Sequence, residues 1–185
     1  MKGILTGSAL AALAMFFWGF LWWGAPHYIP YKTAMKTAPN EAALATALSS
    51  ALPETGVYLL PNPASGASAE DVQKRAAAGP AAQVFFMKEG AAMGAGVFVW
   101  GYAHMFASAF LAGLLLQRVV AATTGYGSRA AVVLLLGFAG AFFSNLGKPI
   151  WWHQPWNYHL IYFAYDFSSW LLAALILAKF VKSAR

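Results

Sequence analysis

Residues 158–178 read YHLIYFAYDFSSWLLAALILA, an apolar stretch with one acidic residue and no basic residue. At ~1.5 Å per residue, a helix of ~20 residues crosses the roughly 30 Å hydrocarbon core of a bilayer. The stretch shows no alternation of apolar and polar residues, so a half-buried strand is not indicated. It therefore predicts a membrane-spanning helix.

Three further stretches meet the same criterion of length and apolar composition: Ile4–Trp23, Val97–Leu116 and Ala130–Leu146. Lipid offers no hydrogen-bond partners to the backbone, so each span is expected to be helical. The sequence thus predicts an all-α membrane fold, a four-transmembrane-helix bundle. Its expected parts are helix 1 within residues 1–23, an extracytoplasmic cap at 24–96, and helices 2–4 within 97–185.

The composition of the 185 residues agrees with a membrane protein: 60% are hydrophobic and only 10% charged. Soluble domains carry roughly 25% charged residues, and disordered chains combine low hydrophobicity with high charge. The net charge of +6 does not indicate nucleic-acid binding, because its basic residues are scattered between apolar blocks. The absence of cysteine excludes disulfides, thiolate metal sites and cysteine nucleophiles.

The segment between the first two spans is patterned like a small folded unit. Asn40 is placed to cap a first helix, which Pro53 ends. Residues 68–71 (SAED) begin a second helix with acidic residues in its first turn, and Gly79-Pro80 stops it. Residues 56–61 (GVYLLP) are a candidate for a short strand bracketed by Gly56 and Pro61, and Ala82–Lys88 is the second strand candidate. We expect a small α/β cap with a thin core formed by Leu44, Leu48, Leu52, Val57, Tyr58, Val84 and Phe86.

Charge asymmetry predicts the orientation of the chain. With the N-terminus inside, the cytoplasmic segments hold six basic residues and no acidic one: Lys2, Arg118, Arg129, Lys179, Lys182 and Arg185. The positive-inside rule then makes both termini cytoplasmic and residues 24–96 periplasmic, in a bacterial inner membrane. Six tryptophans fall near the expected outer boundary, where such rings prefer to lie: Trp22, Trp23, Trp100, Trp151, Trp152 and Trp156.

The last span carries a polar stripe on one helical face: His159, Tyr162, Asp166 and Ser169. Asp166 lies ~12 Å below the start of its span and His104 ~10 Å below the start of the second, which runs the same way. An intramembrane carboxyl is costly and needs a partner. We therefore predict a His104–Asp166 pair, which would be a structural clasp or a site of proton, quinone or ligand chemistry.

Small residues predict where the helices approach closely. The second and third spans are expected to meet through their small faces: Ala109, Gly113, Gly137, Gly140 and Ser144.

Three histidines are expected at the outer rim: His27, His153 and His159. Imidazoles suit copper or zinc, although the spacing matches no known metal motif and an anchoring role is the alternative. Haem b between His104 and His159 would require a large tilt, because their depths differ. No cofactor is therefore predicted, and copper, zinc and haem remain minor alternatives.

Three motifs resemble those of a group of uncharacterised bacterial four-transmembrane inner-membrane proteins: Thr55–Pro61, Gly79-Pro80, and Ile150–Trp156 leading to Asp166. That resemblance implies one span, an outer domain comparable in length to residues 24–96, and three further spans. The topology is also similar to that of claudins, and residues 18–22 (WGFLW) resemble a claudin pattern, but the paired cysteines of that family are absent.

No hydrolase, metalloprotease or P-loop motif is present, so the sequence leans away from an enzyme. We expect a non-enzymatic accessory or structural subunit of a larger membrane protein complex, whose partners are the lipid bilayer and other integral membrane subunits. The alternative is a redox or ligand/metal-binding membrane protein that uses His104–Asp166 or the rim histidines. A small pore is a weaker alternative, because little polarity continues below Ser169.

Overall fold

The computed structural model describes residues 1–24, 29–64 and 66–182, which form two compact units. One unit joins Met1–Lys36 to Gly94–Arg185, and the other is Thr37–Met93. The second unit is shorter than the expected cap of residues 24–96. Helix α2 (Ile29–Thr33) belongs to the first unit, where the Thr33 carbonyl accepts a hydrogen bond from Asn157 Nδ2 at 3.3 Å.

Four helices in the described part of the chain are long and apolar enough to cross a membrane. They are α1 (Lys2–Trp23), α5 (Ala95–Val119), α6 (Tyr126–Trp152) and α7 (Trp156–Phe180). A 3-10 turn, Val120–Ala122, extends α5. The four predicted spans are therefore helical, as expected.

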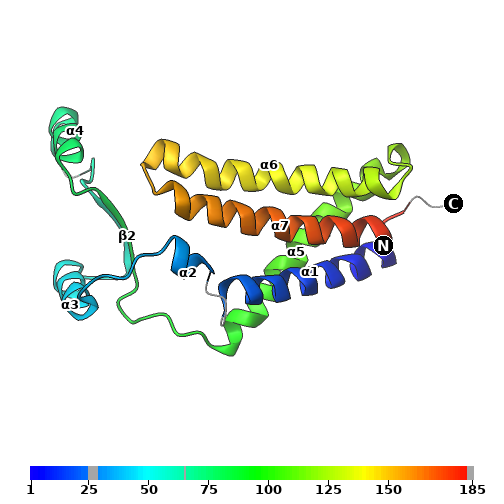
Figure 1. Cartoon of the computed structure of the whole chain (residues 1–185), viewed down its shortest axis with the longest axis horizontal. Helices are drawn as coiled ribbons and strands as arrows, with labels where there is room; N and C mark the ends of the chain where they lie inside the picture. The colour runs from blue at the N-terminus through cyan, green and yellow to red at the C-terminus, as the bar shows by residue number, and fades with distance from the viewer. Residues whose placement is uncertain (25–28, 65, 183–185) are drawn as a thin grey trace. The chain divides into compact units, whose positions relative to one another are not determined.

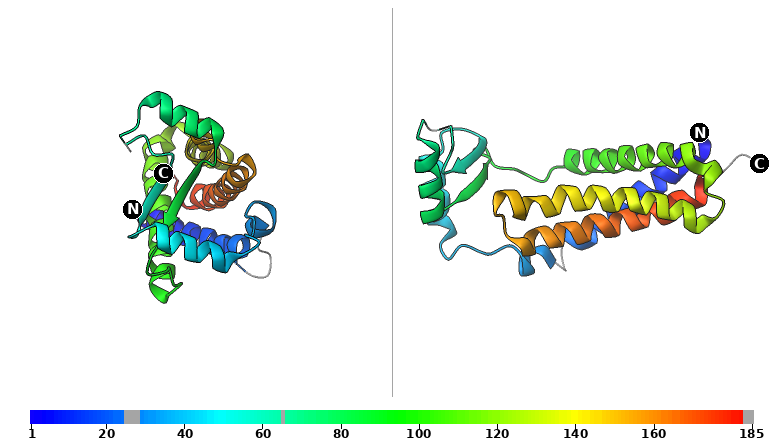
Figure 2. Two further views of the ribbon diagram at one scale, coloured as in Figure 1. Left: turned by 90° about the vertical axis from the view of Figure 1, so that its left-hand side faces the viewer. Right: turned by 90° about the horizontal axis from the view of Figure 1, so that it is seen from above.

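Helix α7 lies between α1 and α6, and α5 packs mainly on α1 (Figure 1). Helices α6 and α7 form an antiparallel hairpin, and α1 begins at the end of the bundle where α7 stops (Figure 2). Alanines occupy much of the fully buried interior: Ala11, Ala12, Ala109, Ala112, Ala173, Ala174 and Ala178. Small side chains let helix backbones approach closely, which is how helices associate in lipid.

Helix α6 is longer than the predicted span Ala130–Leu146 and continues through Pro149 to Trp152. Proline lacks an N–H, so the Asn145 carbonyl loses its usual helical donor, but the helix is not ended. His153 then closes α6 in the left-handed conformation, with φ 51° and ψ 28°. The apolar stretch predicted the span, whereas the polar residues beyond it obscured the last turns.

The second unit has the predicted order of helix, strand, helix and strand. Its elements are α3 (Glu41–Ala51), β1 (Gly56–Leu60), α4 (Ala69–Ala78) and β2 (Ala82–Phe86). Asn40 Oδ1 accepts from Ala43 N at 2.9 Å, so the predicted N-cap is confirmed. Ser68 Oγ accepts from Asp71 N at 3.1 Å and caps the second helix.

The two strands pair antiparallel, with Tyr58 opposite Val84 and Val57 opposite Phe85. Strand β2 ends two residues before the predicted Lys88, whose backbone N–H bonds the Thr55 hydroxyl instead. The predicted core is thinner still than expected. Tyr58 and Val84 are half-buried, Val57 and Phe85 are 60% and 72% exposed, and no described residue of Thr37–Met93 is fully buried.

Candidate functional site

Helix α6 faces α7 through residues spaced by four: Val133, Gly137, Ala141, Asn145 and Pro149. All of them are buried, and this spacing follows one side of a helix. Gly137 is the closest approach, because a Cβ there would lie 2.2 Å from Trp170 Cγ of α7. The glycine thus makes room for the tryptophan.

Asp166 meets Asn145 across this α6–α7 contact. Asn145 Nδ2 donates to Asp166 Oδ2 at 2.7 Å, and Asn145 is only 8% exposed. The same Nδ2 lies 3.0 Å from the Ala141 carbonyl oxygen, which holds the amide toward α7. A buried carboxyl without a partner would be costly, so this hydrogen bond stabilises Asp166 within the bundle.

The predicted His104–Asp166 pair is not formed in the structure. His104 is exposed on α5, and α5 scarcely contacts α7. The matching depths were a necessary condition only, because they do not show which helices are neighbours. Helix α1 is the main neighbour of α5 and α6 that of α7, so Asp166 finds its partner on α6.

The sequence contains a signal that favours Asn145 as the partner of Asp166. Only residues 153–155 connect α6 to α7, and helices joined by a short connection are usually adjacent. A polar residue near the end of the third span was therefore a better candidate partner than one on the second.

The rest of the polar stripe lies on the buried side of α7. His159 is 6% exposed and Ser169 is 3% exposed. The Tyr162 hydroxyl lies 3.1 Å from that of Tyr158, and its ring centroid lies 4.6 Å from that of Trp23 in α1. The stripe thus faces neighbouring helices.

Tryptophans of α1 pack against the part of α7 that carries Asp166. Trp18 Nε1 donates to Ser168 Oγ of α7 at 2.8 Å. Trp22 and Trp23 pack against Tyr165 in tilted and edge-to-face arrangements, with ring centroids 6.1 and 5.4 Å apart. A Cβ at Gly19 would lie 2.8 Å from the Tyr165 hydroxyl, so this glycine admits the tyrosine.

The two rim histidines that the structure describes, His153 and His159, are not gathered into a metal site. His159 Nε2 lies 2.6 Å from Gln154 Oε1, whereas His153 is an exposed helix C-cap. His27 lies outside the described residues. Across the described ranges, no group of three His, Cys, Asp or Glu side chains has an arrangement suited to a metal ion. His104 and His159 also lie on helices that scarcely touch, so the geometry does not support haem between them.

The prediction that α5 and α6 pack together through their small residues is wrong, because these residues contact other helices. Ala109 is fully buried, and a Cβ at Gly113 would lie 2.9 Å from Ile4 Cγ2, so this face packs on α1. Gly137 contacts α7. A Cβ added at Gly140 would meet nothing within 4 Å. Ser144 is exposed, and its hydroxyl lies near the Ala141 carbonyl oxygen of its own helix.

The side chains around Asp166 come from three helices, α1, α6 and α7. An amide and a carboxyl hold one another, and aromatic rings fill the contact with α1. Comparison with protein-family models, curated protein sequences and solved structures gives no match to this chain.

Proposed function

We propose that the protein is a non-enzymatic accessory subunit that docks laterally in a larger membrane protein complex. The observation that supports this best is the exposed His104 in the membrane-spanning segment of α5. Ionisable residues inside a membrane almost always face a protein interior or a water-filled cavity. A partner span covering this face would give His104 such an environment.

The surface around His104 has the features of an incomplete contact. Trp100 and Leu111 lie on the same side of α5 and are 77% and 66% exposed. The buried residues of α5 begin only at Ala109. Its first half contacts Phe16 of α1 through Phe98 and Tyr102 and leaves the side with Trp100 and His104 exposed. A partner helix would pack on this half and offer a polar group to the imidazole.

The small unit Thr37–Met93 provides a second contact surface in this proposal. Val57, Phe85 and Met87 are exposed on its sheet or directly after it. A two-stranded sheet without a buried core is only marginally stable in water. Packing against another protein would stabilise this unit.

The proposed location is a bacterial inner membrane, with both termini in the cytoplasm and Thr37–Met93 in the periplasm. Support comes from the six basic residues and no acidic residue in the segments assigned to the inside. The alternative, a redox or ligand/metal-binding protein using His104–Asp166 or the rim histidines, is less favoured. Asp166 bonds Asn145 instead of His104, and His153 and His159 are not gathered among the described residues.

Site-specific photo-crosslinking tests the docking proposal. A photoreactive residue at position 104, expressed at native level, should form a covalent adduct with one other membrane polypeptide. Leu135 of α6, 67% exposed and apolar, is the matched control and should yield no such adduct.

The variant His104→Leu should lower the recovery of that complex by up to about tenfold, since interhelical hydrogen bonds in membranes contribute roughly 1–2 kcal/mol. A folded monomer at native expression level, with adducts to lipid alone at position 104, would contradict the proposal.

A further inference from the structure

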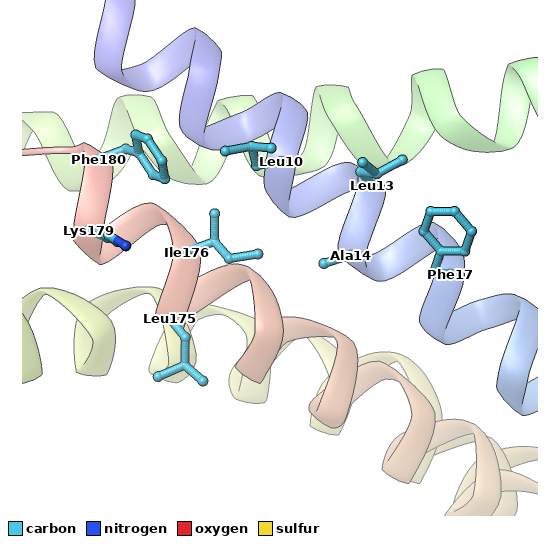
Figure 3. A pocket seen from close by; sticks show the side chains of 8 residues that line it. All are labelled: Leu10, Leu13, Ala14, Phe17, Leu175, Ile176, Lys179 and Phe180. Carbon is cyan, nitrogen blue, oxygen red and sulfur yellow. The ribbon is translucent and has the colours of Figure 1, made fainter.

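A groove of about 480 Å³ runs along the contact between α1 and α7 (Figure 3). One side is formed by α1 residues spaced by three and four: Leu10, Leu13, Ala14 and Phe17. The other side is formed by Leu175, Ile176, Lys179 and Phe180 of α7. Among the described residues, Lys179 is the single charged one that lines the groove.

Lys179 lies at the end of the groove beside the C-terminus of α7, the end expected at the membrane surface if α7 spans the bilayer. It precedes Phe180, the last residue of α7, and its side chain is exposed. Arg129 Nε donates to the neighbouring Ala178 carbonyl at 2.9 Å, which brings a second positive charge to this end of α7. Lys182 follows two residues after the helix, and no acidic residue lies within residues 167–182. An anion is the complementary ligand.

The length of the groove corresponds to one leaflet. Trp18 bonds Ser168, so Phe17 lies near that level of α7. From there to Lys179 is about ten residues, or ~15 Å at ~1.5 Å per residue, which is half of the roughly 30 Å hydrocarbon core. An acyl chain beginning at the membrane surface beside Lys179 would end near the bilayer centre.

The lining favours a flexible chain over a helix as the occupant. Surfaces where membrane helices meet are rich in Gly, Ala, Ser and Thr, which let backbones approach. Of the eight lining residues, Ala14 alone is small, and the others are large apolar side chains and one lysine. A linear hydrocarbon can follow such a surface, and its headgroup can supply the anion.

We propose that this groove binds one acyl chain of an anionic phospholipid, whose phosphate is held by Lys179. The inference is independent of the proposed docking through α5, because it concerns another surface. Basic residues near a membrane surface attract anionic lipid with a free energy that corresponds to roughly fivefold in affinity per residue.

Lipid retention by the whole purified protein tests the proposal. The protein is equilibrated in nanodiscs containing equal amounts of phosphatidylglycerol and phosphatidylcholine, and the lipids that remain bound after extraction are counted by native mass spectrometry. The wild type should retain one phosphatidylglycerol in preference to phosphatidylcholine. Lys179→Gln should lower that preference about fivefold, and Ala14→Phe, which fills the groove, should lower retention of the bound lipid.

Arg118→Gln is the matched control, since Arg118 is an exposed basic residue in the last turn of α5 and does not line the groove. It should leave retention unchanged. Equal retention of both lipids by the wild type, or an unchanged preference in Lys179→Gln, would overturn the proposal whether or not Ala14→Phe folds. Capture of a polypeptide instead of lipid by a photoreactive residue at Leu13 would also overturn it, in favour of a partner helix.

Discussion

Asp166 and Asn145 form a hydrogen bond of 2.7 Å between α7 and α6, and their coupling can be measured. Asn145→Leu leaves the carboxyl without its donor and should destabilise the protein by about 1–2 kcal/mol, near the upper end of hydrogen bonds in membranes. The double variant Asn145→Leu with Asp166→Leu should recover part of that loss, because neither polar group is then unsatisfied. A double-mutant cycle on thermal stability in detergent reports the coupling.

His104→Leu is the control for this cycle. His104 is exposed and has no side-chain contact with Asp166 among the described residues, so its effect should add to that of Asp166→Leu. Coupling between positions 104 and 166, with additivity between 145 and 166, would restore the pair expected from depth alone.

His153 allows a second test at this scale. Its φ of 51° lies in the left-handed region, which glycine adopts without the steric cost of a Cβ. His153→Gly should therefore leave thermal stability unchanged or raise it, by up to ~1 kcal/mol. Zinc titration of both proteins completes the test, since a loss of zinc binding in the variant would make His153 a ligand instead of a turn residue.

Residue types and spacing were sufficient to predict which side of α7 is buried. Asp166, His159 and Ser169 share a face because three- and four-residue spacings do so in any helix. The partner of Asp166 could not be obtained from that spacing. It depends on which helices are adjacent, and α1 and α6, not α5, are the main neighbours of α7.

At the scale of elements, Gly137 lets α6 approach Trp170 of α7 closely. Gly137→Ala would place a Cβ 2.2 Å from Trp170 Cγ, so the tryptophan or the helix must move. Overpacking of this kind costs about 1–3 kcal/mol. Gly140→Ala, one turn away and with nothing within 4 Å, is the matched control. It should be neutral or stabilising by up to ~1 kcal/mol, because alanine is the better helix former.

Thermal unfolding of the two variants in one detergent separates these outcomes. Equal stability of Gly137→Ala and Gly140→Ala would show that Trp170 does not lie against Gly137.

The element boundaries show where sequence patterns are informative. Apolar stretches predicted four helices, and capping residues predicted the starts of α3 and α4, because these signals are local. The last turns of α6 were missed, since Gly147, Lys148 and Pro149 interrupt the apolar pattern without ending the helix. Local signals also do not show which faces of small residues pack against one another.

At the scale of the whole molecule, the two units differ in how much buried interior they contain. The helical unit has a buried interior of alanine and leucine, whereas Thr37–Met93 has no fully buried residue among those described. The thin core of the latter was predictable from its few apolar residues. The uncovered face of α5 was not predictable, because apolar patterns along the chain do not show which spans are neighbours.

The topology of the chain gives the last prediction. One candidate span, α5, separates Ala77 of α4 from Ser128 near the start of α6, so cysteines at these two exposed positions should lie on opposite sides of the membrane. The chain has no cysteine of its own, so each label reports a single site. Ser68 is left in place because its hydroxyl caps α4.

In intact cells, a membrane-impermeant maleimide should label Ala77→Cys and spare Ser128→Cys, and both should label after permeabilisation. The physical reason is the charge distribution, since basic residues near span ends are retained in the cytoplasm. Labelling of position 128 alone would invert the proposed orientation, and labelling of both in intact cells would show that α5 does not cross the membrane.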